Sequence, residues 1–550
     1  MARTSPGVNR RAGWSWAALA ALPIGFLAVF FVWPVAAIVG LGLTDGGVLA
    51  TLSSGQIWPI AVFTIGQALA STAVALLAGL PVAFLLARCR LPGVGLARTL
   101  VLVPFVLPTV VVGLAFRVLL PDSQVLAIVL ANAFFNVAVV ARTVGGLWSH
   151  LDRRAEDAAR VLGASRLRAF RVATLPALRP AITSAAAVVF LFCSTSFGVV
   201  LILGGARYRT LETEIYLRTT QLLDLPGAAA LSLVQFAAVL AALVIGAASR
   251  RRRNATRAGE RPGEKLSAAP DGARRPAGGE WWLVGAAVGT LVLLLVPIVA
   301  LLARSLHTSD GWGITGYRAL LTGDTEGTVA VSGLDAALNS LRTAADATVL
   351  AMVLGVLAAV VLVRLRRTGG ARPVAETLDT ALMLPLGVSA VTVGFGYLVT
   401  LHALPGDLRT SPLLVPFAQA LVVTPLVVRI VLPVLGSIDD RLRQAAATLG
   451  AAPARVWREV DLAIALRSLV AAAGFGYVVA LGEFGATSFL ARPDAPTLPV
   501  VIAELLARPG EQHAQLAYAA CALLMMLTGA VVIALDRLRI AGRAGGLGEF

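Results

Sequence analysis

The segment Asp157–Gly163, Asp-Ala-Ala-Arg-Val-Leu-Gly, returns 287 residues later as Gln444–Gly450, Gln-Ala-Ala-Ala-Thr-Leu-Gly. A repeat that extends this far beyond its central motif indicates two copies of a whole domain, not a solenoid unit. Each half is therefore expected to do the same job against a two-fold symmetric partner. The matches at this offset include Arg142 with Arg429, Phe197-Gly198 with Phe484-Gly485 and Thr210-Leu211 with Thr497-Leu498, while Pro104 and Gly113 match Pro385 and Gly394 at an offset of 281.

The composition is that of a membrane protein. Of the 550 residues, 58% are hydrophobic and only 14% are charged. Crossing a bilayer takes about 20 mostly apolar residues. The sequence therefore predicts an all-α polytopic membrane protein with about twelve transmembrane helices. The segments that pass this test are 15–43, 59–87, 98–120, 124–147, 181–205 and 226–248, followed by 281–304, 338–364, 377–402, 412–435, 468–490 and 514–536.

The predicted spans divide the chain into two six-span domains, 1–248 and 281–540. Residues 249–280 between them are rich in arginine, glycine, proline and alanine and have no hydrophobic periodicity. We expect a disordered cytoplasmic tether there. Because each half has an even number of spans, both halves cross the membrane in the same direction, as a parallel repeat.

The arginines predict the orientation in the membrane. Every basic cluster falls on one side if both termini are cytoplasmic, and the opposite loop 44–58 has no basic residue. The net charge of +16 then reflects topology and attraction to anionic membrane lipid, not a nucleic-acid partner. The clusters are Arg10 and Arg11, then Arg88, Arg90 and Arg98, eight arginines from Arg142 to Arg179, the run Arg250–Arg253, and Arg537, Arg539 and Arg543.

The sequence offers little chemistry of its own. Its one lysine, Lys265, lies in the linker and outside any Gly-Lys-Ser/Thr motif, so the chain cannot hydrolyse ATP through a P-loop. Its cysteines and histidines are too dispersed for a disulfide framework, a metal site or a catalytic triad. We therefore expect no catalytic residue, no metal and no cofactor in this chain. These dispersed residues are Cys89, Cys193 and Cys521, with His150, His307, His402 and His513.

The repeated segment resembles the EAA loop of permeases of binding-protein-dependent (type I) ATP-binding-cassette importers. That loop reads Glu-Ala-Ala, three residues, Gly, nine residues, Ile-x-Leu-Pro. The matching residues are Asp157, Ala158, Ala159, Gly163, Leu175 and Pro176 in the first copy (about 152–180), and Gln444, Ala445, Ala446, Gly450 and Leu462 in the second (about 439–467). The departures are Asp157 and Gln444 for Glu, Ala173 and Val460 for Ile, and Ala463 for Pro.

By its layout the chain resembles the fused two-domain permeases of the thiamine and iron(III) importers. The resemblance implies two tandem six-helix type I importer domains that form a translocation pathway in a bacterial cytoplasmic membrane. It also implies two copies of a cytoplasmic ATPase, which would hydrolyse the ATP, and an extracytoplasmic substrate-binding protein. Each EAA loop would couple the spans to an ATPase. We expect a short helix from Asp157 to Leu162, a break at Gly163 and a second short helix from Leu167 to Val172.

The cargo is ranked from one further resemblance. The region around Leu203-Gly204-Gly205, Thr210–Tyr216, Ala228–Ala230 and Gln235 resembles the fifth-to-sixth-span region of thiamine permeases. The iron(III) permeases share much of this layout, so thiamine ranks first and iron(III) second. An ion-coupled secondary transporter is the alternative from another class. It would explain the hydrophobicity and the missing P-loop, but not two matched EAA loops.

Polar residues within the spans are candidates for a substrate pathway. Glu483 lies in the predicted eleventh span, and its counterpart in the first half is Ser196, close to Ser194. An acidic side chain at the bilayer centre costs about 3 kcal/mol on insertion scales, so Glu483 should face a protein or watery interior. The alternatives are a structural ion pair, for instance with Arg429, or a position near the outer interface.

Overall fold

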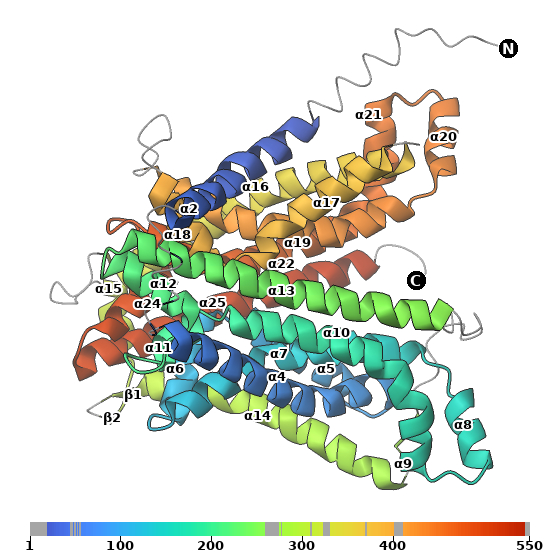
Figure 1. Cartoon of the computed structure of the whole chain (residues 1–550), viewed down its shortest axis with the longest axis horizontal. Coiled ribbons are helices and arrows are strands. Elements are labelled where there is room, and N and C mark those ends of the chain that lie inside the picture. The colour runs from blue at the N-terminus through green and yellow to red at the C-terminus, as the bar shows by residue number, and fades with distance from the viewer. Residues whose placement is uncertain are drawn as a thin grey trace. The chain divides into compact units, whose positions relative to one another are not determined.

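The computed structural model describes residues 19–43, 57–258, 274–276, 278–308, 311–322, 331–368, 371–400 and 411–544, together with 48, 51, 53 and 55. For 242–258 and most of 535–544 this description is limited to the backbone. The described chain is built of helices, as its hydrophobic segments predict (Figure 1). The one sheet within it is a hairpin of β1 (His307–Thr308) and β2 (Gly311–Trp312), with His307 opposite Trp312.

Two compact units make up the fold, and each contains one helix from the other half of the sequence. The first-half unit is Asp45–Gly313, and the second-half unit joins Met1–Thr44 to Ile314–Phe550. The boundaries predicted from the repeat, 1–248 and 281–540, mark the duplicated sequence. The compact units differ from these boundaries because the first span of each half packs in the unit of the other half.

The first-half unit is centred on the packed pair α4 and α7. A Cβ on Gly79 of α4 would lie 2.6 Å from Cβ of Val140 on α7, so glycine lets these two helices approach closely. The elements are α4 (Ile57–Arg88), α5 (Val94–Val106), α6 (Thr109–Leu119), α7 (Gln124–His150), α8 (Arg154–Val161), α9 (Arg166–Ala169), η3 (Phe170–Thr174), α10 (Leu175–Ser194), α11 (Gly198–Leu203), α12 (Leu211–Thr220), α13 (Leu225–Ala258), η4 (Gly278–Glu280) and α14 (Trp281–Leu306).

The second-half unit repeats this centre with α16 and α19. A Cβ on Gly355 would lie 2.6 Å from Cγ1 of Val427, which stands 287 residues after Val140. The elements are η1 (Ala28–Val32), α2 (Trp33–Leu43), α15 (Thr315–Thr322), α16 (Gly333–Arg367), α17 (Arg372–Gly387), α18 (Ala390–Thr400), α19 (Leu414–Ser437), α20 (Asp440–Thr448), α21 (Pro453–Val456), η6 (Trp457–Leu462), α22 (Ala463–Leu481), α23 (Thr487–Leu490), α24 (Leu498–Ala507) and α25 (Glu511–Ala544).

Among the described residues, nine helices are long and apolar enough to cross a membrane, or eleven if each of two bent pairs counts as one span. The sixth predicted span, 226–248, is the remaining one, and it coincides with α13, whose residues Leu225–Ala241 are apolar. The all-α polytopic prediction is therefore confirmed.

Two of the predicted spans, 98–120 and 377–402, are not continuous helices. They bend by 100° between α5 and α6 and by 96° between α17 and α18. Leu107 has extended backbone angles because the following Pro108 disfavours a helical conformation there. In the second half Val388 is extended in the same way, and the Ser389 hydroxyl accepts the Val391 N–H at 3.0 Å to start the next helix.

The linker is structured at both ends, contrary to the expected disordered tether. Helix α13 continues through residues 249–258. At the other end Arg274 pairs with the end of α4: its N–H donates to Arg88 O at 3.1 Å, and its carbonyl accepts the Arg90 N–H at 2.8 Å. The rest of the linker, 259–273 and 277, lies outside the described residues.

Candidate functional site

The first EAA loop is a short helix that ends in a left-handed glycine turn. Helix α8 ends at Val161, and Gly163 has a φ of +87°. The Gly163 N–H donates to Arg160 O and the Ala164 N–H to Ala159 O, each at 3.0 Å, which satisfies carbonyls at the helix end. Only glycine takes this backbone conformation at little cost.

The second EAA loop has the same local fold. Helix α20 ends at Thr448, and Gly450 has a φ of +82°. Its N–H donates to Ala447 O and the Ala451 N–H to Ala446 O, again at 3.0 Å each. The helix–glycine–helix arrangement expected from the sequence is thus present in both halves.

Each loop continues into a long apolar helix through a π-helical turn. After the second short helix, α9 or α21, the chain passes through η3 or η6 and enters the long helix α10 or α22. Leu175 and Pro176 begin α10, and Leu462 ends η6. Short π segments inside helices often mark functional positions.

The helices α8 and α20 each present an exposed face, which we call the coupling face. It consists of Asp157, Ala158 and Leu162 in the first loop, and Gln444, Ala445 and Leu449 in the second. Leu162 is 87% exposed and Leu449 is 89% exposed at the same repeat position. A single exposed leucine is common on protein surfaces. Here both copies carry an exposed leucine at the same position just after the helix, an apolar tip that is typical of a partner contact.

On its inner side each short helix is fastened to the π-turn by one polar pair. In the first loop the Thr174 hydroxyl donates to Oε2 of Glu156 at 2.9 Å. In the second loop Arg443 donates from Nε and Nη2 to Oδ1 of Asp461, at 2.8 and 2.5 Å. The repeat offset of 287 relates Glu156 to Arg443 and Thr174 to Asp461, so equivalent positions carry different chemistry.

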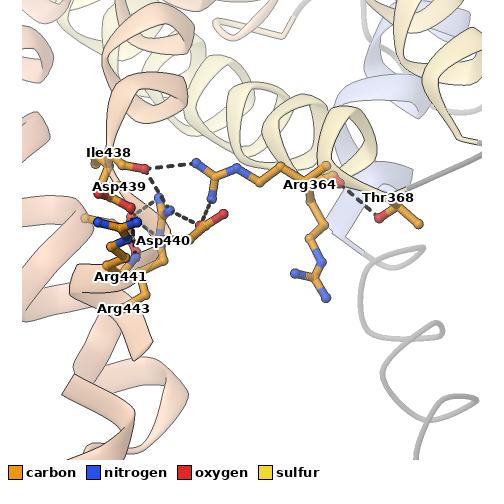
Figure 2. A network of polar contacts seen from close by, with 9 residues as sticks. Arg364, Thr368, Ile438, Asp439, Asp440, Arg441 and Arg443 are labelled. Carbon is orange, nitrogen blue, oxygen red and sulfur yellow. Dashed lines mark hydrogen bonds and ion pairs between the residues drawn. The ribbon is translucent and has the colours of Figure 1, made fainter. Parts of the chain in front are cut away.

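The pair in the second loop belongs to a larger charged network. Nη1 of Arg443 donates to Asp440 Oδ1 at 2.7 Å and to Ile438 O at 3.2 Å. Arg367, at the end of α16, donates to the same two oxygens at 2.5 and 3.1 Å. Figure 2 shows Ile438, Asp440 and Arg443 gathered at the start of α20.

The carboxylates of this network act on the charge of Arg443. Burial lowers the pKa of the Arg443 guanidinium, but hydrogen bonds and electrostatic attraction from Asp461 and Asp440 outweigh burial and raise that pKa above its usual value. Asp461 itself is only 6% exposed. The guanidinium therefore stays charged and held between two carboxylates.

The first loop has a different neighbour, the C-terminal arm of the linker. Within that arm Arg274 forms an ion pair with Glu280 at 2.5 Å. Gly278 has a φ of +53°, and a Cβ there would lie 2.7 Å from Nη1 of Arg166 on α9. The linker arm thus rests against the first EAA loop.

The three candidate pathway residues lie where α10 and α22 stop. Ser194 is the last residue of α10, and its hydroxyl donates to Leu191 O at 2.9 Å. The Ser196 hydroxyl donates to Oδ1 of Asn132 at 2.7 Å, and the Asn132 amide donates to Gln67 Oε1 at 3.0 Å. Ser196 is thus part of a polar network of the first-half unit, whereas Ser194 bonds only within its own helix.

Glu483 caps a short helix. Its carboxylate accepts the Ala486 N–H at 2.8 Å, the Thr487 N–H at 3.1 Å and the Thr487 hydroxyl at 2.5 Å, at the start of α23. The suggested ion pair with Arg429 is wrong, since Arg429 Nε points to Met383 Sδ at 3.1 Å. Glu483 is 8% exposed, which agrees with the expected protein interior.

The residues on which the cargo ranking rests form the scaffold of the first-half unit. A Cβ on Gly204 would lie 2.1 Å from Tyr208 O, and Gly205 has a φ of +56°, so the turn requires both glycines. Glu212 of α12 is fully buried and accepts a hydrogen bond from Gln235 of α13.

Sequence reasoning missed the polar pairs behind the coupling faces. The sequence does contain a clue to these pairs. Positions 156 and 443 are equivalent in the repeat, as are 174 and 461, and all four carry polar residues. Because the paired residue types differ between the copies, only their contacts reveal the common role.

The known proteins that this chain resembles are all membrane components of transport systems. Residues 75–254 match the family described as "Binding-protein-dependent transport system inner membrane component". The thiamine transport system permease protein ThiP of Brucella abortus (strain 2308) is 27% identical over 544 residues, which cover 93% of this chain and 94% of that protein. The sulfate transport system permease protein CysT of Salmonella typhimurium is 35% identical over 222 residues, or 35% of this chain and 79% of that protein. The putrescine transport system permease protein PotI of Escherichia coli (strain K12) is 26% identical over 228 residues, or 40% of this chain and 78% of that protein.

Proposed function

The chain belongs to the family of binding-protein-dependent transport system inner membrane components, and on that premise we propose that its two halves together form the translocation pathway of one ATP-binding-cassette importer. The observation that carries this proposal is the pair of EAA loops, which share the turn at Gly163 and Gly450 and the exposed tip at Leu162 and Leu449. A secondary transporter has no need for two such matched loops.

The proposed partners are two copies of a cytoplasmic ATPase and an extracytoplasmic substrate-binding protein. Each ATPase would receive one coupling face, because an amphipathic helix with an apolar tip fits a groove in another protein. ATP-driven closure of the ATPases would draw α8 and α20 together and open the pathway outward, and hydrolysis would reset it. The permease holds two states of similar free energy, and its partners supply the bias.

This proposal fixes an orientation in the membrane. The EAA loops, the linker and both termini would be cytoplasmic, as the arginine distribution predicts. Cysteines introduced in loops 44–58 and 305–335 should react with an impermeant reagent from outside, whereas cysteines at 255–275 should not. Labelling of the 255–275 segment in intact cells would contradict this orientation.

We propose thiamine or a phosphorylated form of it as the cargo. Support comes from the likeness to thiamine permeases along nearly the whole chain, whereas the likeness to the sulfate and putrescine permeases covers less than half of it. The glycine turn at Gly204 and Gly205 and the Glu212–Gln235 contact show that the similar residues build the domain.

Two experiments test the function. The permease should co-purify with its ATPase, and the EAA substitutions discussed below should weaken that association. Cells that lack their own thiamine importer should take up labelled thiamine when given the permease, its ATPase and its binding protein. Uptake of ferric iron without thiamine would change the cargo and leave the permease assignment in place. Uptake that needs no ATPase would overturn the importer assignment.

A further inference from the structure

We propose that the residue pair behind each coupling face is a positioning clasp, Glu156–Thr174 in the first half and Arg443–Asp461 in the second, and that the second clasp holds its helix more rigidly. The clasp would set the angle between the coupling helix and the span that follows it. This inference rests on the proposed function only in assuming that α8 and α20 receive the ATPases.

The two pairs occupy the same place in each loop. Each joins a half-buried residue of the first short helix to the π-turn, η3 or η6, that leads into the long helix. Their inner members are equally buried, since Thr174 and Asp461 are each 6% exposed. A contact that closes the loop at this point couples the movement of the short helix to that of the long helix.

The chemistry of the two clasps differs. The first consists of one hydrogen bond, in which a neutral hydroxyl donates to a carboxylate. The second consists of a guanidinium that donates twice to Asp461 and once to Asp440. Both clasps include an ionised carboxylate, but in the second clasp the donor is also charged and is a planar guanidinium that donates from three nitrogens. That arrangement is stronger and more directional than a single bond from a rotating hydroxyl.

The second clasp is also tied to a third segment. Arg367 joins the end of α16 to Asp440 and to the carbonyl of Ile438 at the start of α20. In the first half Arg88 likewise donates to the equivalent carbonyl, Leu151 O, at 3.0 Å. The position of Asp440 is occupied there by Arg153, which cannot accept a hydrogen bond from an arginine. The carboxylate that Arg367 contacts in the second half is thus replaced by a cation at the equivalent position of the first half.

A difference in rigidity follows for the transfer of motion. If its ATPase displaced α20, helix α22 would follow closely, because α16, α20 and η6 are joined in one polar network. Displacement of α8 would reach α10 through the packing of α8 on η3 and the single hydrogen bond between Glu156 and Thr174, and the linker arm at Gly278 and Arg166 lies beside it. The two ATPase sites would then act on the pathway unequally, although the ATPase subunits are identical.

The test exchanges the clasps between the halves. Arg443→Glu places a third carboxylate beside Asp461 and Asp440, and it should lower transport about tenfold or more, since like charges at a buried site repel. Arg443→Glu combined with Asp461→Thr installs the first-half pair at the second position. The double variant should recover most of the lost transport, with a coupling between the two substitutions that simple additivity does not give.

A second measurement is independent of transport and of the ATPase. Amide hydrogen exchange of the full permease in lipid nanodiscs should be slower in α20 than in α8. Exchange in α20 should speed up in the Arg443→Glu variant and slow again in the double variant. Arg441→Glu is the matched control, because it makes the same charge change on α20 at an exposed side chain, and it should leave the exchange of α20 close to that of the wild type.

The outcomes separate the clasp from the importer function. Equal exchange of α8 and α20, or a double variant no better than Arg443→Glu in both measurements, overturns the proposal. If exchange follows the expected order while no ATPase associates with either loop, the clasp stands and the importer function fails. If the ATPase associates normally and the exchange order is absent, the importer function stands and the clasp fails.

Discussion

Gly163 and Gly450 adopt the same left-handed backbone conformation, with φ of +87° and +82°, at positions 287 residues apart. A Cβ at either position would meet nothing within 4 Å. Crowding therefore does not explain the glycines, and the need for a positive φ does.

Replacement of either glycine should weaken coupling through the backbone alone. A left-handed conformation costs an ordinary residue about 1–2 kcal/mol, so Gly163→Leu and Gly450→Leu should leave the permease in the membrane but reduce ATPase association and transport. The double variant should be at least as severe as either single change. Gly163→Asn and Gly450→Asn are the controls, because asparagine tolerates this conformation best among the other residues. A double leucine variant that transports normally would refute the EAA assignment.

The exposed leucines should matter for the partner and not for folding. Leu162→Gln and Leu449→Gln remove an apolar tip that is almost fully exposed, so the thermal stability of the isolated permease should be unchanged. Co-purification of the ATPase should fall several-fold, in line with the loss of an apolar interface anchor. Val161→Thr is the matched control, since the second copy carries Thr448 at that position. Equal loss of ATPase in the control would contradict a specific role for the leucine tip.

Substitution of Glu483 should affect the stability of the protein, as expected for a helix cap, and not the binding of cargo. The Glu483 carboxylate accepts hydrogen bonds from three donors, whereas a glutamine side chain has only one acceptor oxygen. Glu483→Gln should therefore destabilise the protein by about 0.5–2 kcal/mol, which is the usual cost of losing a helix cap. The transport KM should stay constant. Ser488→Ala, which removes a neutral hydroxyl bonded to Gly485 O at 2.8 Å in the same turn, should cost less. A raised KM with unchanged thermal stability would instead support the pathway role of Glu483.

The three native cysteines should react only slowly with labelling reagents in the folded protein. Cys89, Cys193 and Cys521 are all buried. Burial, together with the nearby charge of Glu280, raises the pKa of the Cys89 thiol to about 11. Since the thiolate is the reactive form, this raised pKa keeps the Cys89 thiol protonated and unreactive at pH 8. A permeant maleimide should therefore modify the wild type slowly and the Leu162→Cys variant quickly, while all three native cysteines should react in denaturant. Rapid labelling of the folded wild type at pH 8 would show that this packing is wrong.

The placement of the N-terminal helix can be tested at Gly396. A Cβ there would lie 2.8 Å from Cβ of Pro34 and 3.2 Å from Cδ1 of Ile38, so Gly396→Val should loosen α2 from α18 at a cost of about 1–3 kcal/mol. The loss should appear as a lower melting temperature and faster proteolysis of the N-terminal helix. Gly436→Val in α19 is the control, because a Cβ there has open space. Equal effects of both substitutions would argue against the exchanged first helix.

Much of this protein could be predicted from the order of its residues. Hydrophobic length predicts the helices, because a bilayer imposes it on any span. The recurrence of Asp157–Gly163 as Gln444–Gly450 predicts the duplication and both glycine turns, because positive φ is a local property of the backbone that glycine meets wherever it stands.

Other features depend on contacts that sequence does not encode locally. The bend at Leu107 has a local signal in Pro108, but the matching bend at Val388 has no proline after it. The first helix packs in the second-half unit, where Pro34 lies close to Gly396. The order of the chain alone would place this helix with the rest of the first half. Hydropathy places a helix in the membrane and does not choose its neighbour.

The polar pairs behind the coupling faces show the same limit most clearly. Glu156 and Arg443 carry opposite charges at equivalent positions, so the sequence by itself suggests that the site has diverged. The folded chain brings each of them to the π-turn of its own half, where Thr174 and Asp461 provide the complementary groups. Sequence determined the helices, their duplication and the glycine turns, which follow from local backbone and solvation energies. Tertiary structure alone decided which side chains meet, because a contact between residues 18 positions apart depends on how two helices and a π-turn close on one another.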